Sequence, residues 1–88
     1  MAQPARTASI SFREERYPPY DAAHGTPHEM VRRVLQFDLP DGNATWEQTD
    51  YGHPGRLNPW DPRGIDTRLQ PKTAQLRTAA EAIGALLT

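Results

Sequence analysis

Along this chain, hydrophobic and polar residues first alternate and later recur with a helical period. In residues 9–16, SISFREER, Ile10 and Phe12 share one side and polar residues take the other, which is the pattern of a half-buried strand. We therefore predict a strand there. The preceding residues 1–7 hold no apolar run, and we expect a disordered tail.

The next segment fits two structures. Thr26, Pro27 and Glu29 can begin a helix as N-cap, first residue and capping box. Residues 33–39 instead alternate as a strand would. They are followed by the turn sequence PDGN and by ATWEQTDY, which is rich in strand formers. We favour a β-hairpin, with room for one helical turn before it, and residues 27–36 stay open between helix and strand.

The last segment, residues 72–88, has the period of an amphipathic helix. Pro71 suits the first helical position, and Gly84 costs only about 1 kcal/mol relative to alanine. The predicted apolar face consists of Leu76, Ala79, Ala80, Ile83, Leu86 and Leu87.

Between hairpin and helix lies the segment YGHPGRLNPWDPRGIDTRLQP, residues 51–71, which contains four prolines and three glycines. We expect a long ordered loop there, because the regularly placed Leu57, Trp60, Ile65 and Leu69 would serve no purpose in a solvated linker. The predicted fold is a single α+β domain over residues 1–88. Residues 8–50 form a small antiparallel sheet of about three strands, and one C-terminal helix packs on one of its faces.

Composition limits the kinds of site that the protein can hold and the compartment in which we expect it. The chain has 88 residues, no cysteine and a net charge of −1, so disulfides and thiolate metal sites are excluded and a reducing cytoplasm is the default. MAQPARTAS lacks the apolar run of a signal peptide, and no window reaches the length of a membrane span. We expect a cytoplasmic protein with no membrane partner.

Catalytic signatures are missing. His24 and His28 are four residues apart, but Gly25 and Pro27 lie between them, so we predict no metal site. No nucleophile elbow, phosphate loop or dinucleotide motif occurs. Asp61 and Asp66 are best explained by turns and local ion pairs. We predict no enzymatic activity and no cofactor.

Protein binding is the function we favour, since tyrosine, tryptophan and arginine anchor many interfaces. The predicted surface is Tyr51, Arg56, Trp60 and Arg63, although Trp60 fits a core position equally well. The strand at residues 9–16 is a second candidate surface, because an edge strand can pair with a partner's strand. The partner would be another protein, in a hetero-complex or by self-assembly; inhibitors and adaptors of bacterial or phage origin are often this small.

Charge distribution supports an alternative. Residues 1–50 hold five arginines against eight acids, net −3, and residues 51–88 hold five basic residues against three acids, net +2. Tyr51, His53 and Trp60 could stack on bases within that basic half, as in single-strand nucleic-acid binding. The slightly acidic chain as a whole argues against this alternative. A third hypothesis is an accessory subunit of an enzyme, with a site under the loop.

Overall fold

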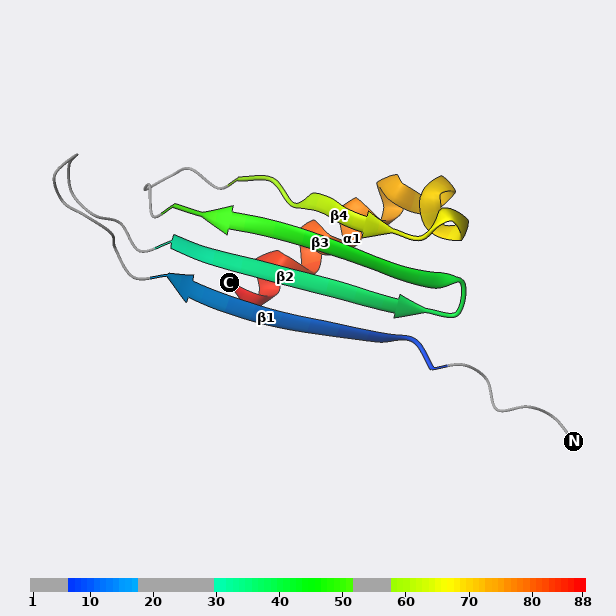
Figure 1. The fold of residues 1–88 in the computed structure, drawn as a ribbon, viewed down its shortest axis with the longest axis horizontal. Helices are drawn as coiled ribbons and strands as arrows, with labels where there is room; N and C mark the ends of the chain where they lie inside the picture. Colours follow the sequence, from blue (N-terminus) through cyan, green and yellow to red (C-terminus); the bar gives the residue numbers. More distant parts are fainter. Residues whose placement is uncertain (1–6, 18–29, 52–57) are drawn as a thin grey trace, which may run out of the picture.

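The computed structural model describes residues 7–17, 30–51 and 58–88. Its strands form a four-stranded antiparallel sheet in the order β1-β2-β3-β4, and a helix lies against one face (Figure 1). The elements are β1 Ser9–Tyr17, β2 Met30–Leu39, β3 Gly42–Asp50, β4 Asp61–Ile65, a 3₁₀ helix Thr67–Lys72 and α1 Thr73–Leu87. The α+β class is confirmed.

The central hairpin is the one that the sequence predicts. β2 and β3 pair over Val31↔Asp50 to Leu39↔Gly42, so only Pro40 and Asp41 form the turn. Gly42 follows them with φ of 137°, a conformation that favours glycine because other residues have a Cβ. For residues 30–36 the strand interpretation is therefore correct. The proposed helix start at 26–29 lies outside the described residues.

The sheet has four strands rather than about three, because part of the predicted loop is β4. Pro62 disfavours a central strand, because proline has no N–H to donate to a neighbouring strand. A strand at the edge of a sheet can hold a proline, because one of its sides needs no N–H donor. A register shift between Thr45 and Trp46 accompanies this pairing. The end of β4 is fixed by Asp66, whose N–H donates to the Asn43 carbonyl at 3.0 Å and whose carboxylate accepts from the Asn43 N–H at 2.7 Å.

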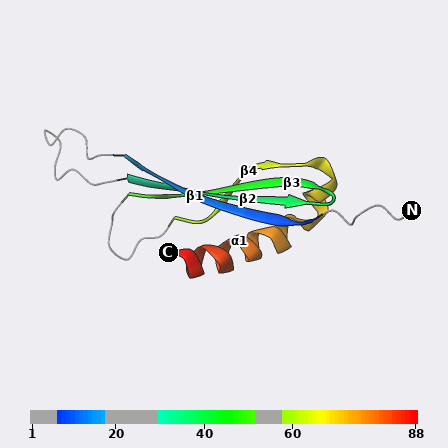
Figure 2. The same ribbon diagram turned by 90° about the horizontal axis from the view of Figure 1, so that it is seen from below.

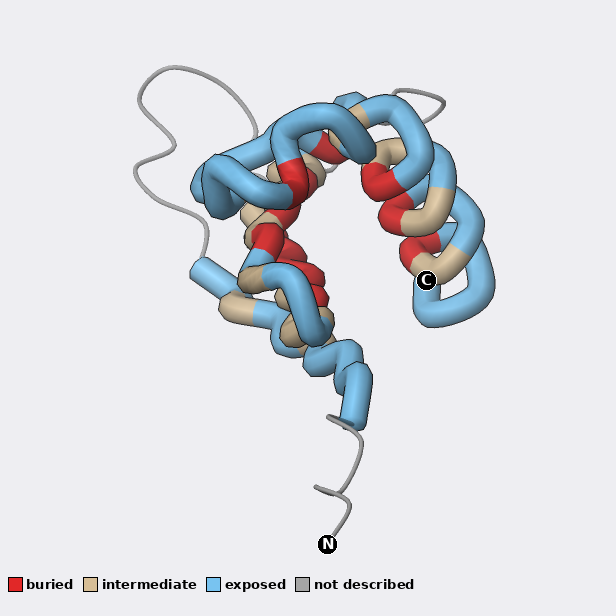
Figure 3. The backbone as a smooth tube through the Cα atoms, turned by 90° about the vertical axis from the view of Figure 1, so that its right-hand side faces the viewer, coloured by how far each residue is buried: buried red, intermediate tan, exposed pale blue. Residues whose placement is uncertain are grey.

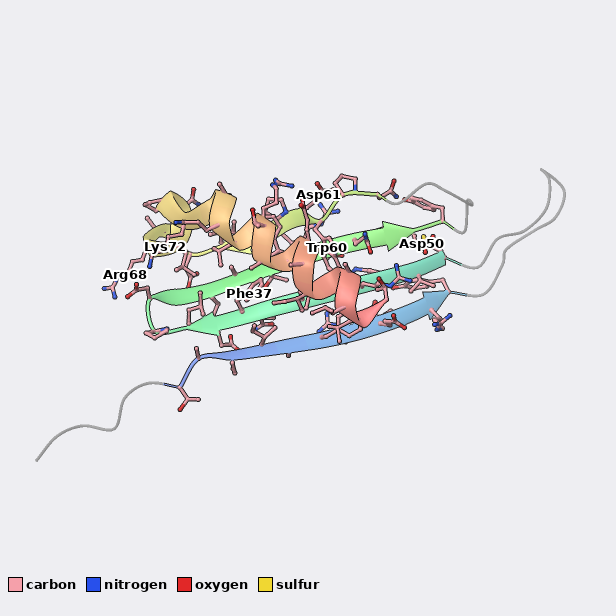
Figure 4. The ribbon with its side chains drawn as sticks, turned by 180° about the vertical axis from the view of Figure 1, so that it is seen from behind. Phe37, Asp50, Trp60, Asp61, Arg68 and Lys72 are labelled. Carbon is pink, nitrogen blue, oxygen red and sulfur yellow. The ribbon has the colours of Figure 1, made fainter. Side chains whose placement is uncertain are left out.

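The C-terminal helix is confirmed, with one difference at its start. Pro71 lies inside the 3₁₀ helix rather than in the first turn of α1. From there α1 crosses the sheet obliquely, from the β4 side toward β1 and β2, and forms a second layer beneath it (Figures 2 and 4). Its main contacts with the sheet are to β3 and β4.

The core lies between α1 and the face of the sheet that it covers, and the buried backbone of both layers faces inward (Figure 3). Trp60 packs so closely on α1 that a Cβ at Gly84 would lie 2.6 Å from its indole ring. The helix therefore needs glycine at this position for close packing, whatever its helix propensity. The buried cluster comprises Leu35, Phe37, Ala44, Trp46, Trp60, Leu69, Leu76 and Ala80.

Candidate functional site

Of the four residues of the predicted binding surface, the structure describes Tyr51, Trp60 and Arg63, and it does not bring these three together on one surface. Trp60 is 3% exposed and belongs to the core, so its ring is not displayed to a partner. Its neighbours Asn58 and Pro59 are exposed, so the backbone before Trp60 lies at the surface while the indole ring is buried in the core. Arg56 lies outside the described residues. Tyr51 is 51% exposed and directly follows β3.

Arg63 lies on β4, away from Tyr51. Its neighbour Pro62 pairs with Trp46, and Tyr51 is five residues further along the chain from Trp46, about 16 Å in an extended strand. The Arg63 side chain is engaged within the molecule, with Nε 3.0 Å from Glu47 Oε2. The predicted loop surface is therefore divided between two places.

The basic residues of the second half are also largely engaged. Arg77 donates from Nη1 to the Trp60 carbonyl at 2.8 Å, and its guanidinium carbon lies 5.1 Å from the centroid of the Trp46 ring. Lys72 Nζ is 3.7 Å from Asp41 Oδ2. Together with the Arg63–Glu47 pair, these contacts leave residues 58–88 without a continuous basic stripe of the kind that follows a phosphate backbone.

The two edges of the sheet differ in a way that the sequence did not show. β4 has five residues, includes Pro62 and lies beside the irregular pairing at Thr45. β1 has nine residues without proline or glycine, in unbroken register from Ser9↔Asp38 to Tyr17↔Met30.

An edge strand leaves its outward N–H and C=O groups available to another strand, and natural proteins usually block such edges. Of the features that block an edge, β4 has short length, a proline and a neighbouring bulge, whereas β1 has only charged side chains in its second half. Within residues 7–17, 30–51 and 58–88, no strand pairs with the outer side of β1. We therefore take β1 as the candidate site.

On the face of the sheet without the helix, β1 begins a ladder of ion pairs. Glu15 Oε1 is 3.3 Å from Arg13 Nε, and Glu15 Oε2 accepts from the Tyr17 hydroxyl at 2.8 Å and from Arg32 Nη1 at 3.2 Å. Arg32 also donates to Glu47, and Glu47 in turn pairs with Arg63. The ladder thus joins all four strands.

The ladder changes the titration of its two carboxylates. The hydrogen bond from Tyr17, with the charges of Arg32 and Arg13, lowers the pKa of Glu15. The hydrogen bond from Arg32, with the charges of Arg32 and Arg63, lowers the pKa of Glu47. Both carboxylates therefore stay charged to a lower pH than an ordinary glutamate does.

The same ladder explains a buried residue on the open face. Val34 is only 4% exposed, although no helix covers this side of the sheet. Its cross-strand neighbours are Arg13 on β1 and Glu47 on β3. Long charged side chains can cover apolar groups with their aliphatic stems while their charged ends stay in water.

On the helix side, β1 divides into an apolar and a charged half. Ile10 is 51% exposed and Phe12 is half-buried. Glu14 accepts from Arg16 Nη2 and from Arg33 Nε, both at 3.3 Å. Arg33 is buried and also donates to Gln48 Oε1 at 3.2 Å. The sequence signal for both networks was the charged run REER after SISF, which we interpreted only as the polar part of a strand.

A cavity of about 190 Å³ lies between the end of β3 and the last turns of α1, lined by Trp60, Gly84 and the polar side chains of Gln48, Asn58 and Glu81. The Gln48 amide is engaged at both atoms, since it accepts from Arg33 and donates to the Asn58 carbonyl at 2.9 Å. This cavity therefore brings together no pair of groups suited to acid–base chemistry.

The described part of the chain was compared with the requirements of a metal site and of a membrane-spanning helix. No group of three or more histidines, cysteines, aspartates or glutamates in the described part of the chain could hold a metal ion, and the three histidines His24, His28 and His53 lie outside that part. Among the described helices, none is long and apolar enough to cross a membrane.

Comparisons of the chain with protein-family models, with curated proteins and with solved structures each found no match.

Proposed function

We propose that this chain is a small non-enzymatic protein-binding module that receives a partner's β-strand along β1. The observation that carries the proposal is the contrast between the blocked β4 edge and the regular β1 edge. Strand addition obtains affinity from main-chain hydrogen bonds and specificity from the alternating side chains.

The side chains of β1 suit this role on both faces. Ile10, 51% exposed, and the half-buried Phe12 offer apolar contacts beside the helix-covered core. Beyond them, Arg13 and Glu15 present a positive and a negative charge on the opposite face, with 62% and 35% of their side chains exposed. A partner strand would therefore be selected by apolar residues at one end and by charge at the other.

Proline substitution on β1 tests the proposal. Successive N–H groups of an edge strand point alternately to the neighbouring strand and to solvent. One of the variants Ile10→Pro and Ser11→Pro therefore keeps the β1–β2 bonds but removes an outward donor. Circular dichroism identifies which variant stays folded.

The tagged wild-type chain, the folded proline variant and a control, Gly64→Ala on β4, are then used to capture partners from the native host. We expect the wild type and Gly64→Ala to retain the same protein, which mass spectrometry identifies, and the proline variant to lose it. Equal capture by the proline variant would refute the assignment to β1.

A further inference from the structure

We infer that the strand received by β1 is β1 of a second copy of this chain, so that two copies form a symmetric dimer. This inference rests on the proposed function and names its partner. The supporting feature is that the charged positions of β1 are complementary to themselves. Arg13 and Glu15 lie on the same face, two residues apart, with 62% and 35% of their side chains exposed.

The spacing of these charges selects one register. When two identical strands pair antiparallel about a twofold axis, the residue on the axis faces its own copy, and residues at equal distances on either side face each other. With Glu14 on the axis, Arg13 of each copy lies opposite Glu15 of the other. An axis at Arg13, Glu14 or Glu15 places one like pair on the axis itself, which destabilises a sheet. The axis at Glu14 adds two Arg13–Glu15 contacts and two Phe12–Arg16 contacts, whereas the axis at Arg13 adds no opposite charges and the axis at Glu15 adds only the Glu14–Arg16 contacts.

The residue on the axis is itself compensated. Each Glu14 accepts from Arg16 and Arg33 of its own chain, both at 3.3 Å, so the two carboxylates would meet with four arginines around them. The same register places Phe12 opposite Arg16 of the other copy. An arginine can lie over an aromatic ring and cover it with its stem.

The position of α1 is compatible with a twofold axis at Glu14. The helix runs toward the β1–β2 side of the sheet (Figures 1 and 4) and ends in Leu86 and Leu87, which are 86% and 48% exposed. A twofold axis perpendicular to the joined sheet keeps both helices on the same face, with the C-terminal ends of the helices on the side of the axis. Because the β4 edges are blocked, such an isologous contact closes at two copies.

Sedimentation equilibrium of the full chain, from about 1 μM to about 1 mM, covers the affinities expected of a small interface. We expect the wild type to convert from monomer to dimer and to form nothing larger. Arg13→Glu and Glu15→Arg should each weaken dimerisation at least about tenfold, because each variant places like charges opposite each other.

The decisive measurement is an equimolar mixture of the two variants. One copy then carries two acidic residues at positions 13 and 15 and the other carries two basic ones, so both contacts between positions 13 and 15 join opposite charges. We expect the mixture to recover a dimer that neither variant forms alone. Arg68→Glu, a matched charge reversal at an exposed residue of the 3₁₀ helix, should dimerise like the wild type.

Amide exchange of the unmodified chain provides a second readout if a variant fails to fold. The outward N–H groups of β1 should exchange more slowly at the higher concentration, while those of β4 should not change. A wild type that stays monomeric throughout the range would overturn the dimer, but β1-dependent capture of a different protein would still support the proposed function. Dimers that are indifferent to the charge reversals, or mixed variants that stay monomeric, would overturn the register and with it this inference.

Discussion

The two edge strands of this sheet, β1 and β4, differ in length, in regularity of pairing and in what packs against them. β4 is short, contains Pro62 and is fastened at its end by Asp66. β1 is nearly twice as long and pairs without interruption with β2. The helix packs mainly against β3 and β4. Stability is thus concentrated on the β4 side, and the β1 side keeps its backbone groups available.

The largest expected difference between the two sides comes from their apolar residues. Trp60→Ala empties a buried position in the core beside β4 and should lower the free energy of unfolding by about 3–5 kcal/mol. Ile10→Ala on β1 removes a side chain that is already 51% exposed, and should cost less than about 1 kcal/mol. Urea denaturation of both variants measures the difference. Similar losses would show that the core does not favour the β4 side.

Gly84 and Gly64 differ in the same way, since one lies in tight packing and the other beside open space. At Gly84 a Cβ would lie 2.6 Å from the Trp60 ring, whereas at Gly64 nothing lies within 4 Å. Overpacking costs about 1–3 kcal/mol, whereas replacing glycine by alanine within a helix gains about 1 kcal/mol. Gly84→Ala should therefore lower the free energy of unfolding by up to about 2 kcal/mol. Gly64→Ala should match or slightly exceed the wild type. Thermal melts of the two variants test this prediction, and a stabilised Gly84→Ala would mean that Trp60 can move aside.

The ion-pair ladder joins the two edges and should depend on pH. The pKa of Glu47 is lowered from its ordinary value of 4.5. Its contribution is therefore complete above that pH and is lost as the pH falls through the lower pKa of the folded state. Glu47→Gln should cost about 1 kcal/mol at pH 7, because pairs near the surface are screened.

The cost of Glu47→Gln should shrink in acid, which denaturation curves at neutral and acidic pH measure. If Glu47→Gln lowers the free energy of unfolding equally at neutral and acidic pH, the ion pairs of the ladder do not stabilise the fold.

The smallest effect is expected at the turn beside β4. Lys72 and Asp41 are 58% and 59% exposed and 3.7 Å apart, and such pairs contribute little. Lys72→Ala should change the free energy of unfolding by less than about 0.5 kcal/mol, as measured by urea denaturation. A larger loss would show that this pair helps Asp66 to hold the end of β4.

The hairpin and the helix could be predicted because each depends on local pattern. Alternation around Leu35 and Phe37 has the period of a strand, the turn at Pro40–Gly42 has a specific backbone requirement, and α1 has the helical period. The charged half of β1 was visible as REER, but its partners on β2 and β3 were not. Those contacts depend on register, which a strand's own sequence does not contain.

By itself, the sequence determined the α+β class, the central hairpin and the amphipathic C-terminal helix. Only the tertiary structure decided that residues 61–65 pair with β3 despite Pro62, because whether a missing N–H is tolerated depends on which side of the strand is free. It also placed Trp60 in the core, because an aromatic residue in a loop becomes core or surface according to what packs against it, here Gly84. The open β1 edge has the same origin, since an edge is a property of neighbours rather than of a strand.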